Sequence, residues 1–138
     1  MTPTLAADIR SLIGQLRRRL KKEVPAHGLS LPEQAVVIRL ERDGPATLTA
    51  LAQAEGVRSQ SMGATVAVLK AAGLIAGTPD PTDGRQTVLS LTATCRDLLH
   101  AHRAAREDWL AQVIAARFTP QEQETLAAGV ELLKRLLD

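Results

Sequence analysis

The stretch from Leu48 to Leu91 decides the fold of this chain. Read in chain order, its parts are the helical run Leu48-Thr49-Ala50-Leu51-Ala52, the break Gly56-Val57, a second helical run to Ala72, the segment Gly73-Leu74-Ile75, the turn Asp80-Pro81-Thr82-Asp83-Gly84-Arg85, and the alternating run Thr87-Val88-Leu89-Ser90-Leu91. Glycine and proline mark turns, and alternation of apolar and polar residues marks a half-buried strand. The predicted order is therefore helix, turn, helix, strand, tight turn and strand.

This order is the layout of a winged helix-turn-helix, in which the second helix of the pair enters the major groove of DNA. The sequence therefore predicts a mainly α fold with a small β-hairpin as its wing. We expect Thr49 to cap the first helix of the pair, and the second helix to begin near Arg58 or Ser59 and to end at Gly73. The inward face of the second helix is expected to hold Met62, Val66 and Leu69.

Two helices are expected before this stretch. Apolar residues three or four positions apart predict the first, from about Leu5 to Val24, and Pro25 and Gly28 then end it. Ser30 is expected to be the N-cap of the next helix, and Glu33 stands three residues later, where it completes a capping box. The apolar side of this helix is expected at Leu31, Ala35, Val37 and Ile38.

Two further helices are expected after the stretch. The first begins at Thr92 or Thr94 and runs to about Arg117. The second begins at Thr119-Pro120-Gln121-Glu122, where threonine caps the helix, proline takes its first position and glutamate its third. The apolar stripe of the last helix is too broad for a lone surface helix. It comprises Leu126, Val130, Leu133, Leu136 and Leu137.

The stripes on the first and last helices predict pairing with a second copy of the chain. Burial of the same stripes within one chain is the alternative that the pattern leaves open. With 138 residues and 45% apolar content, the chain 1–138 is expected to form a single domain. Within it, residues 30–91 are expected to be the winged helix-turn-helix unit, and residues 1–26 and 92–138 the dimerisation helices.

Composition narrows the classes of function. No run of about 18 apolar residues occurs, so no membrane span is expected. The single cysteine forms no internal disulfide and fits a reducing cytoplasm. Trp109 and Phe118 are the only aromatic residues, which argues against binding of single strands by stacking. The net charge is only +2, and the basic excess lies in residues 17–22, as either a solvated helix face or a surface for phosphate or a partner.

Catalysis finds little support in the sequence. The residues that suggest a metal ion or a nucleophile are His27, Cys95, His100 and His102. On one helix, Cys95 and His102 lie ~10 Å apart along the axis and His100 points to another side, so they do not converge on one metal ion within a chain. The chain also lacks a glycine-rich phosphate loop. We therefore expect no enzyme, no cofactor and no metal site.

The chain resembles the MarR-type (multiple antibiotic resistance regulator) transcription factors over nearly its whole length. The most specific likeness is the Asp-Pro-x-Asp-x-Arg turn at 80–85, which is followed by Leu91-Thr92. Further likeness lies in residues 48–52, Gly56-Val57, Arg58-Ser59-Gln60-Ser61-Met62, Leu69 and Gly73-Leu74-Ile75. Gly77 stands where these proteins usually carry arginine. The resemblance implies a homodimer that binds palindromic promoter DNA, in many cases as a repressor that a small aromatic or phenolic ligand, or oxidation, releases.

Polar side chains gather where such a fold would meet double-stranded DNA. Small polar residues and free N–H groups at the start of the second helix suit phosphate and base edges. Gln60 can bond adenine bidentately, and Arg58 can bond guanine or phosphate, whereas Ser59 or Ser61 could instead cap the helix. Arg85 suits a narrow minor groove, or an ion pair with Asp80 or Asp83. The expected DNA-contacting residues are Thr49, Arg58, Ser59, Gln60, Ser61, Thr65, Asp83 and Arg85.

The resemblance also implies an effector site between the dimer helices and the winged unit. Its expected walls are Leu12, Leu16, Val37 and Trp109. Two other functions stay open beside the ligand-released repressor. One is a redox-responsive regulator that acts through Cys95, because a cysteine in the first turn of a helix beside Arg96 can favour thiolate, although an inert packed cysteine is the competing interpretation. The other is a winged-helix module that binds a protein.

Overall fold

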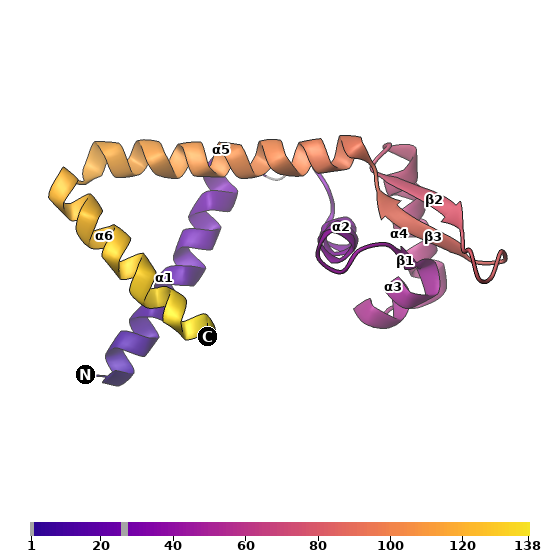
Figure 1. The fold of residues 1–138 in the computed structure, drawn as a ribbon, viewed down its shortest axis with the longest axis horizontal. Coiled ribbons are helices and arrows are strands. Elements are labelled where there is room, and N and C mark those ends of the chain that lie inside the picture. The colour runs from indigo at the N-terminus through magenta and orange to yellow at the C-terminus, as the bar shows by residue number, and fades with distance from the viewer. Residues whose placement is uncertain (1, 26–27) are drawn as a thin grey trace. The chain divides into compact units, whose positions relative to one another are not determined.

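The computed structural model describes residues 2–25 and 28–138, and His27 lies outside them. The elements of the chain, coloured in order in Figure 1, are α1 (Thr2–Glu23), α2 (Leu31–Asp43), β1 (Ala46–Thr47), α3 (Leu48–Glu55), α4 (Ser59–Ala71), β2 (Ile75–Pro79), β3 (Thr87–Leu91), α5 (Ala93–Arg117), α6 (Pro120–Leu133) and the 3-10 turn η1 (Lys134–Leu137). The chain divides into two compact units. We call Ala26–His102 the central unit, and Met1–Pro25 with Arg103–Asp138 the terminal unit.

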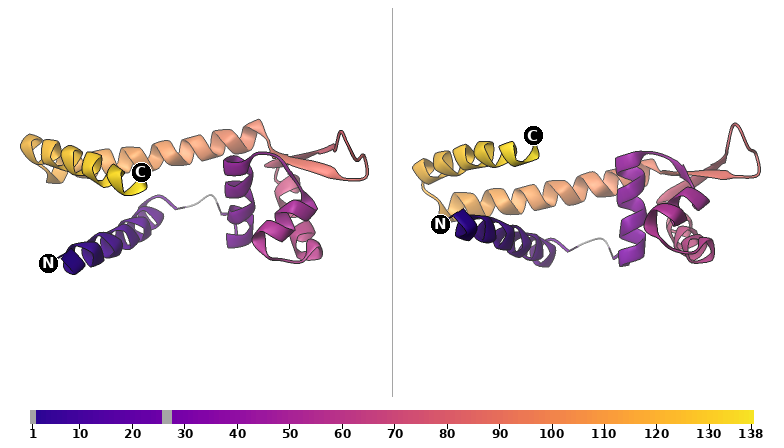
Figure 2. Two further views of the ribbon diagram at one scale, coloured as in Figure 1. Left: turned by 60° about the horizontal axis from the view of Figure 1, so that its bottom comes forward. Right: turned by 90° about the horizontal axis from the view of Figure 1, so that it is seen from below.

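The central unit contains a three-stranded antiparallel sheet in the order β1-β3-β2. In the hairpin, Ile75 pairs with Leu91 and Pro79 with Thr87, and the hairpin extends away from α3 and α4 (Figure 2). On the other side of β3, Ala46 pairs with Leu89. The sequence predicted the hairpin but not β1, because a strand of two residues has no alternation to detect. The mainly α fold with a small wing is confirmed.

Local signals position most of the helix ends as predicted. Ser30 and Glu33 form the capping box of α2, and Thr119 and Glu122 form that of α6. Gly56, with φ of 66°, ends α3 in the left-handed conformation that glycine adopts without strain. The prediction for the start of α3 was wrong. The Thr47 hydroxyl, and not that of Thr49, accepts the hydrogen bond from the Ala50 N–H, which moves the start of α3 two residues upstream.

The last turn of α4 ends in a Schellman motif around Gly73. The Leu74 N–H donates to the Leu69 carbonyl and the Gly73 N–H to the Lys70 carbonyl, each at 3.0 Å. The chain then returns along β3 to Thr92. Its N–H donates to the Leu74 carbonyl at 3.1 Å, its hydroxyl donates to the Gly73 carbonyl at 2.6 Å, and the same hydroxyl accepts from the Cys95 N–H at 3.2 Å. Thr92, and not Thr94, is therefore the cap of α5.

The core of the molecule lies in the central unit, where α2, α3 and α4 pack against one another and against the sheet. Its buried residues are Val36, Val37, Leu40, Leu51, Ala52, Met62, Val66, Leu69, Leu74, Ile75, Leu89, Leu91 and Cys95. The predicted inner face of α4, Met62, Val66 and Leu69, is confirmed. The predicted face of α2 was right only at Val37, which is buried. Leu31 and Ile38 are exposed, and Val36 and Leu40 are buried in their place.

The terminal unit has no comparable core. Among the described residues, every buried side chain lies between Val36 and Cys95. The predicted apolar stripes of the terminal helices have exposed residues in the single chain, namely Leu5, Leu12, Ile13 and Leu16 on α1, Leu126, Val130 and Leu133 on α6, and Leu136 and Leu137 on η1. Contact between α1 and α5 in this unit includes the guanidinium of Arg19, which lies 5.8 Å from the ring centre of Trp109.

Candidate nucleic-acid interface

The N-terminus of α4 carries exposed polar groups without a side-chain cap. Arg58 occupies the N-cap position and its side chain makes no capping bond, so neither Ser59 nor Ser61 acts as the cap that the sequence allowed. Arg58, Ser59, Gln60 and Ser61 are all exposed. The first N–H groups of a helix have no partner within it and carry a partial positive charge, so this end suits an anion. It can therefore accept a phosphate while the side chains beside it contact base edges.

Burial on the opposite side holds this helix end in place. Met62, Val66 and Leu69 on the inner face of α4 are buried in the core. The preceding turn is closed by the Val57 N–H, which donates to the Ala52 carbonyl at 3.0 Å. The outward residues of α4 are therefore presented by a helix that has little freedom to rotate about its axis.

An ion pair from α2 also supports the helix-turn-helix. The Arg39 guanidinium donates from Nε to the Glu55 carboxylate at 2.9 Å, and from a terminal nitrogen to the Ala54 carbonyl at 3.5 Å. Both side chains of the pair are largely buried, and Arg39 lies 3.5 Å from Asp43 as well. A cation at the C-terminal end of a helix is favourable to its dipole, so Arg39 ties α2 to the end of α3 just before the turn.

The wing between β2 and β3 is shaped by its two aspartates. The Asp80 carboxylate accepts from the N–H and the hydroxyl of Thr82, each at 2.9 Å, and these bonds hold the pKa of Asp80 below its usual range. The Asp83 carboxylate accepts from the backbone N–H of Arg85 at 3.1 Å. Among the described residues, no ion pair engages the Arg85 side chain, which is exposed. The wing therefore presents a cation whose backbone is fixed by Asp83.

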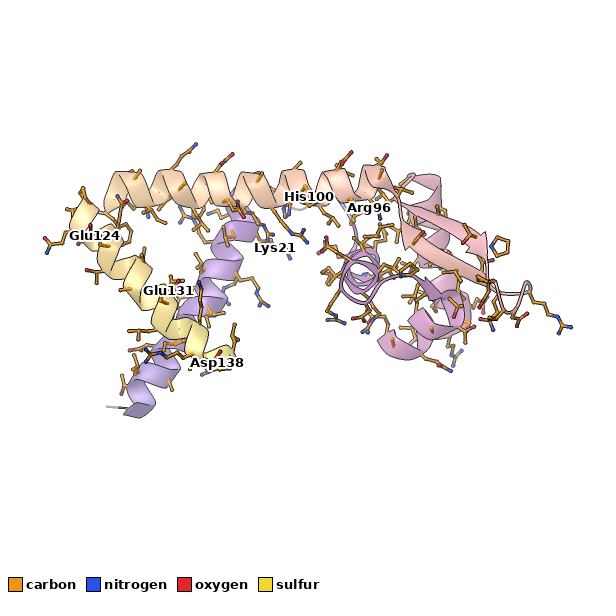
Figure 3. All side chains as sticks on the ribbon, viewed as in Figure 1. Lys21, Arg96, His100, Glu124, Glu131 and Asp138 are labelled. Carbon is orange, nitrogen blue, oxygen red and sulfur yellow. The ribbon has the colours of Figure 1, made fainter. Side chains whose placement is uncertain are left out.

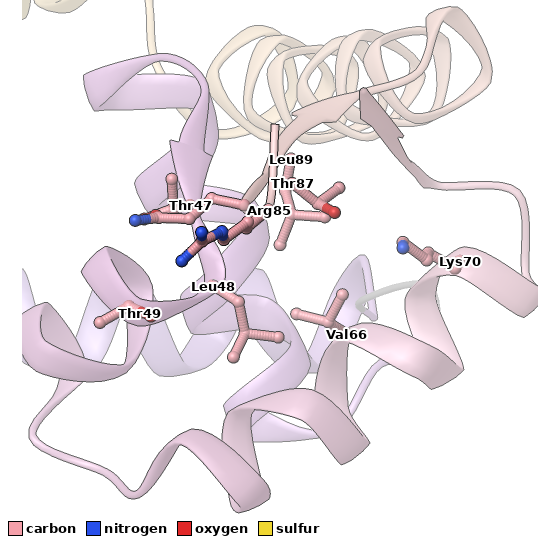
Figure 4. Close-up of a pocket in the computed structure, with 9 residues that line it drawn as sticks. Thr47, Leu48, Thr49, Val66, Lys70, Arg85, Thr87 and Leu89 are labelled. Atoms are coloured by element: carbon pink, nitrogen blue, oxygen red, sulfur yellow. The ribbon is translucent and has the colours of Figure 1, made fainter. Parts of the chain in front are cut away.

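A groove of about 270 Å³ lies between the start of α3, the outer part of α4 and the wing (Figure 4). Its lining residues are Thr47, Leu48, Thr49, Val66, Lys70, Arg85, Gln86, Thr87 and Leu89. The structure thus brings Thr49 and Arg85, from separate parts of the sequence, to one groove. Thr65 lies elsewhere on α4, half-buried, and its hydroxyl donates to the Ser61 carbonyl of the same helix.

Lys70 is a groove cation that the sequence reasoning missed. Its position four residues after Val66, on the same side of α4, is the signal that could have found it. A Cβ built on Gly77 of β2 would lie 3.3 Å from the Lys70 ammonium and 2.6 Å from the Thr87 methyl group. Gly77, at the position where the family resemblance implies an arginine, therefore leaves open the space beside the Lys70 ammonium.

The residues expected to form an effector site fall in different parts of the molecule. Val37 is buried in the core of the central unit, where it lines a cavity of about 30 Å³ with Leu29, Leu74, Cys95, Leu98 and Leu99. Leu12 and Leu16 are exposed on α1 of the terminal unit, and Trp109 is half-buried on α5.

Cys95 is buried at the third position of α5. Burial raises the pKa of its thiol above the ordinary 9.0, and the negative charge of Glu41 raises it further, while Arg96 opposes them. The neighbouring arginine therefore does not produce a reactive thiolate. Across residues 2–25 and 28–138, no group of three or more His, Cys, Asp or Glu residues is placed to hold a metal ion. No helix in the same ranges is long and apolar enough to cross a membrane.

The exposed N-terminus of α4, the helix-turn-helix beneath it and the wing beside it define a winged helix-turn-helix DNA-binding protein. The sequence profile of the MarR family matches residues 27–86. An HTH-type transcriptional regulator of Mycobacterium tuberculosis is 33% identical over 134 residues, covering 97% of this chain and 93% of the relative. An uncharacterized HTH-type regulator of Mycobacterium leprae is 31% identical over the same shares. This chain belongs to the MarR family of transcriptional regulators.

Solved structures agree with this assignment. A putative transcriptional regulator from Pseudomonas aeruginosa PA01 is 34% identical, with a TM-score of 0.74 over 99% of this chain and 94% of that one. The regulator Tm0710 from Thermotoga maritima has a TM-score of 0.79 over 99% of this chain and 95% of its own at 19% identity, a likeness of fold alone. The chain is therefore a DNA-binding transcriptional regulator, and the family and these relatives are regulators rather than enzymes.

Proposed function

We propose that this regulator is a homodimeric repressor that binds a palindromic operator and is released by a small molecule. The observation that carries the proposal is the exposed N-terminus of α4, which has no side-chain cap and stands on a helix whose other face is buried. In this arrangement α4 enters the major groove and the wing reaches the neighbouring minor groove.

Each residue expected to contact DNA has a role in the proposal. Gln60 bonds adenine through its amide, and Arg58 bonds guanine or a phosphate. The N–H groups at the start of α4, with the hydroxyls of Ser59 and Ser61, bind a phosphate. Arg85 enters the minor groove from the wing. Thr49 and Thr65 lie at the edges of the contact, and Asp83 supports it by fixing the backbone of Arg85.

The apolar stripes of the terminal unit support the dimer. Leu12 and Leu16 on α1, and Leu126 and Val130 on α6, are between 40% and 62% exposed in the single chain. A second copy related by a two-fold axis would cover them with the same residues. Two recognition helices would then lie one turn of DNA apart, ~34 Å, and a two-fold protein reads a palindromic site.

Release by an effector rests on the resemblance to ligand-responsive members of the family. The proposed walls that a ligand can reach are Leu12, Leu16 and Trp109, which suit an apolar carboxylate or a phenol; Val37, the fourth expected wall, is 2% exposed and would contact a ligand only after a change of conformation. Because the chain has one tryptophan, the emission of Trp109 reports on this region. A ligand that prefers one conformation must shift this emission and the affinity for DNA together. A broad ligand set that leaves DNA affinity unchanged would identify a constitutive binder instead.

The decisive experiment compares Gln60→Ala and Arg85→Ala on an operator selected from a random duplex pool and on a scrambled duplex, at two salt concentrations. Gln60→Ala should cost ~1–3 kcal/mol on the operator and little on the scrambled duplex. Arg85→Ala should weaken both and reduce the salt slope by roughly one unit. The matched controls are Gln112→Ala and Arg117→Ala, at exposed positions of α5.

Two outcomes would contradict the proposal. If Arg85→Ala binds both duplexes like the parent at each salt concentration, the wing does not contact DNA. If Gln60→Ala also keeps full discrimination, α4 is not the recognition helix, and a winged-helix module that binds a protein becomes the better interpretation. The redox alternative has less support, because the Cys95 thiol is buried and its pKa is raised.

A further inference from the structure

The second half of α1 carries a basic face that the proposed function does not use. We define this basic face as Arg17, Arg18, Lys21 and Lys22, all four of which are exposed. Lys21 stands in the last turn of the helix (Figure 3). At 100° per residue these positions lie within about 140° of one another, on a single side of α1.

Arg19 belongs to the same run but has a different role. Its guanidinium donates to the Glu23 carboxylate at 3.0 Å and lies 5.8 Å from the centre of the Trp109 ring. It therefore joins α1 to α5 inside the terminal unit. No such contact engages the basic face: among the described residues, neither a salt bridge nor a side-chain hydrogen bond involves its four cations.

The basic face weakens the helix that carries it. Arg17 and Lys21 are four residues apart, as are Arg18 and Lys22, and like charges at this spacing repel each other. The helix dipole compensates for cations in the last turn, which accounts for Lys21 and Lys22 but not for two arginines a turn earlier. Helix stability therefore does not account for the four cations on this face, whereas binding of an anion does.

The basic face also points away from the apolar stripe of α1. Leu12, Leu16 and Leu20 lie on the other side of the helix, some 180° from the middle of the basic face. A second copy of the chain that covers the stripe would therefore leave the four cations of each protomer exposed. The basic face remains available in the proposed dimer.

Charge is distributed unevenly between the parts of the chain. The central unit carries six basic and seven acidic side chains, a formal charge of −1, although it contains the whole helix-turn-helix and the wing. Residues 1–25 carry six basic and two acidic side chains, a formal charge of +4, against +2 for the entire chain. Duplex DNA is bound without regard to sequence by neutralising its phosphates, and the central unit has little charge for this task.

We propose that the basic face of α1 binds the phosphate backbone of duplex DNA and supplies most of the salt-dependent, sequence-independent affinity of this regulator. The inference rests on the proposed function, because it assigns to α1 the electrostatic part of the DNA binding that α4 and the wing make specific. Recognition of sequence and attraction to phosphate are then carried by different units of the chain.

The test replaces all four cations, as Arg17→Gln, Arg18→Gln, Lys21→Gln and Lys22→Gln, in the full chain. Affinity is measured on a mixed-sequence 40-bp duplex without an operator over a range of salt concentrations. Each lost phosphate contact lowers the slope of log affinity against log salt by ~0.9, so a loss of about 2–4 units per protomer is expected. Affinity at the lowest salt concentration should fall at least tenfold.

The control removes the same total charge elsewhere, through Arg42→Gln, Arg117→Gln, Lys134→Gln and Arg135→Gln, four exposed positions. It should keep a slope within about one unit of the parent. The paired variants Arg17→Gln/Lys21→Gln and Arg18→Gln/Lys22→Gln guard against misfolding, because each removes a repulsive pair and should leave helix content unchanged. Each pair should lose about half of the total slope.

The inference is overturned if the fourfold variant keeps the slope of the parent, or if the control loses as much slope as the variant does. It is also overturned if the variant loses binding only to vesicles containing anionic phosphatidylserine, which would identify a membrane surface. Discrimination between operator and scrambled duplex separates the two proposals. If the parent distinguishes the operator from the scrambled duplex but the fourfold variant keeps the salt slope of the parent, only the role of α1 is rejected. If the parent binds neither duplex, the proposed function is rejected.

Discussion

The two units of this chain obtain their stability in different ways. In the central unit, α2, α3, α4 and the sheet surround one core, in which Leu51 and Leu69 are completely buried. In the terminal unit, α1 and α6 have apolar stripes of similar length, yet no described side chain on either helix is buried. The central unit is therefore built to fold from its own residues. The terminal unit leaves its apolar stripes exposed in the single chain, which is the surface that the proposed dimer would cover.

Burial within one chain and burial between two copies both contribute to the free energy of unfolding, but they depend differently on protein concentration. Burial within one chain stabilises it equally at every protein concentration. Burial between two copies stabilises by mass action and increases with protein concentration. Substitutions in the two units should therefore differ in their dependence on concentration as well as in size.

The largest effect is expected at the centre of the core. Leu69→Ala removes a fully buried side chain from α4 and should lower the free energy of unfolding by about 2–5 kcal/mol at any protein concentration. Its neighbour Val68 is 54% exposed, so Val68→Ala should change the same quantity by less than about 0.5 kcal/mol. Chemical denaturation of both variants checks this difference, and equal losses would mean that α4 does not pack as described.

A smaller effect, dependent on concentration, is expected in the terminal unit. Leu126→Ala on α6 should weaken the proposed dimer by about 1 kcal/mol per protomer, because the exposed part of the leucine is covered only by the partner. Sedimentation at several micromolar concentrations measures the shift towards monomer. Glu124→Ala, on another face of the same helix, is the control and should leave the equilibrium unchanged. A parent protein that sediments only as monomer would contradict the dimer itself.

Capping should distinguish two threonines that lie two residues apart. Thr47→Ala removes the oxygen that accepts the Ala50 N–H at the start of α3 and should cost about 1 kcal/mol of stability. Thr49 is exposed within the first turn of α3 and makes no such bond, so Thr49→Ala should leave stability nearly unchanged. Thermal unfolding of the two variants in parallel is the measurement, and a larger loss for Thr49→Ala would restore the start of α3 that the sequence predicted.

The smallest effect is expected at Cys95. Its raised pKa keeps the buried thiol protonated at neutral pH, so peroxide should leave DNA affinity unchanged and a thiol reagent should react only as fast as the protein opens. The contribution of this group to stability is complete below the ordinary pKa of 9.0 and is lost as pH rises further, because the unfolded thiol ionises first. Cys95→Ala is the control, and rapid labelling of the folded parent at neutral pH would contradict the burial.

The sequence predicted helix ends and buried faces correctly where the residue pattern allowed a single interpretation. Ser30 and Thr119 were identified as caps because each is followed by a glutamate at the third helical position. The inner face of α4 was predicted because Met62, Val66 and Leu69 recur at spacings of four and three, with no large apolar residue between Met62 and Val66. In α2, apolar residues occupy consecutive positions from 35 to 38, so periodicity alone could not choose between Ile38 and Val36. The choice came from packing against α4 and β3.

The part of the candidate interface that depends on local sequence was predicted, and the part that depends on the folded arrangement was not. Arg58, Gln60 and Arg85 follow from a helix start and a turn, which are local features of the chain. The groove between α3, α4 and the wing depends on pairing between β1 and β3, and Lys70 enters it only after the chain has folded. Asp83 was expected to contact DNA. In the structure its carboxylate accepts a hydrogen bond from the backbone N–H of Arg85 within the turn.

The three hydrogen bonds of Thr92 have a mechanical consequence. Two of them join Thr92 to Gly73 and Leu74, which follow α4, and the third joins Thr92 to Cys95 in the first turn of α5. The first turn of α5 cannot rotate without stretching these bonds, so it moves with the end of α4 as one rigid joint. α5 has 25 residues and a length of ~37 Å, so a tilt of about 5° at the joint displaces its far end by roughly 3 Å. Thr92 thus couples the orientation of α5 to that of α4, and the length of α5 turns a small change of angle at the joint into a displacement of a few ångströms.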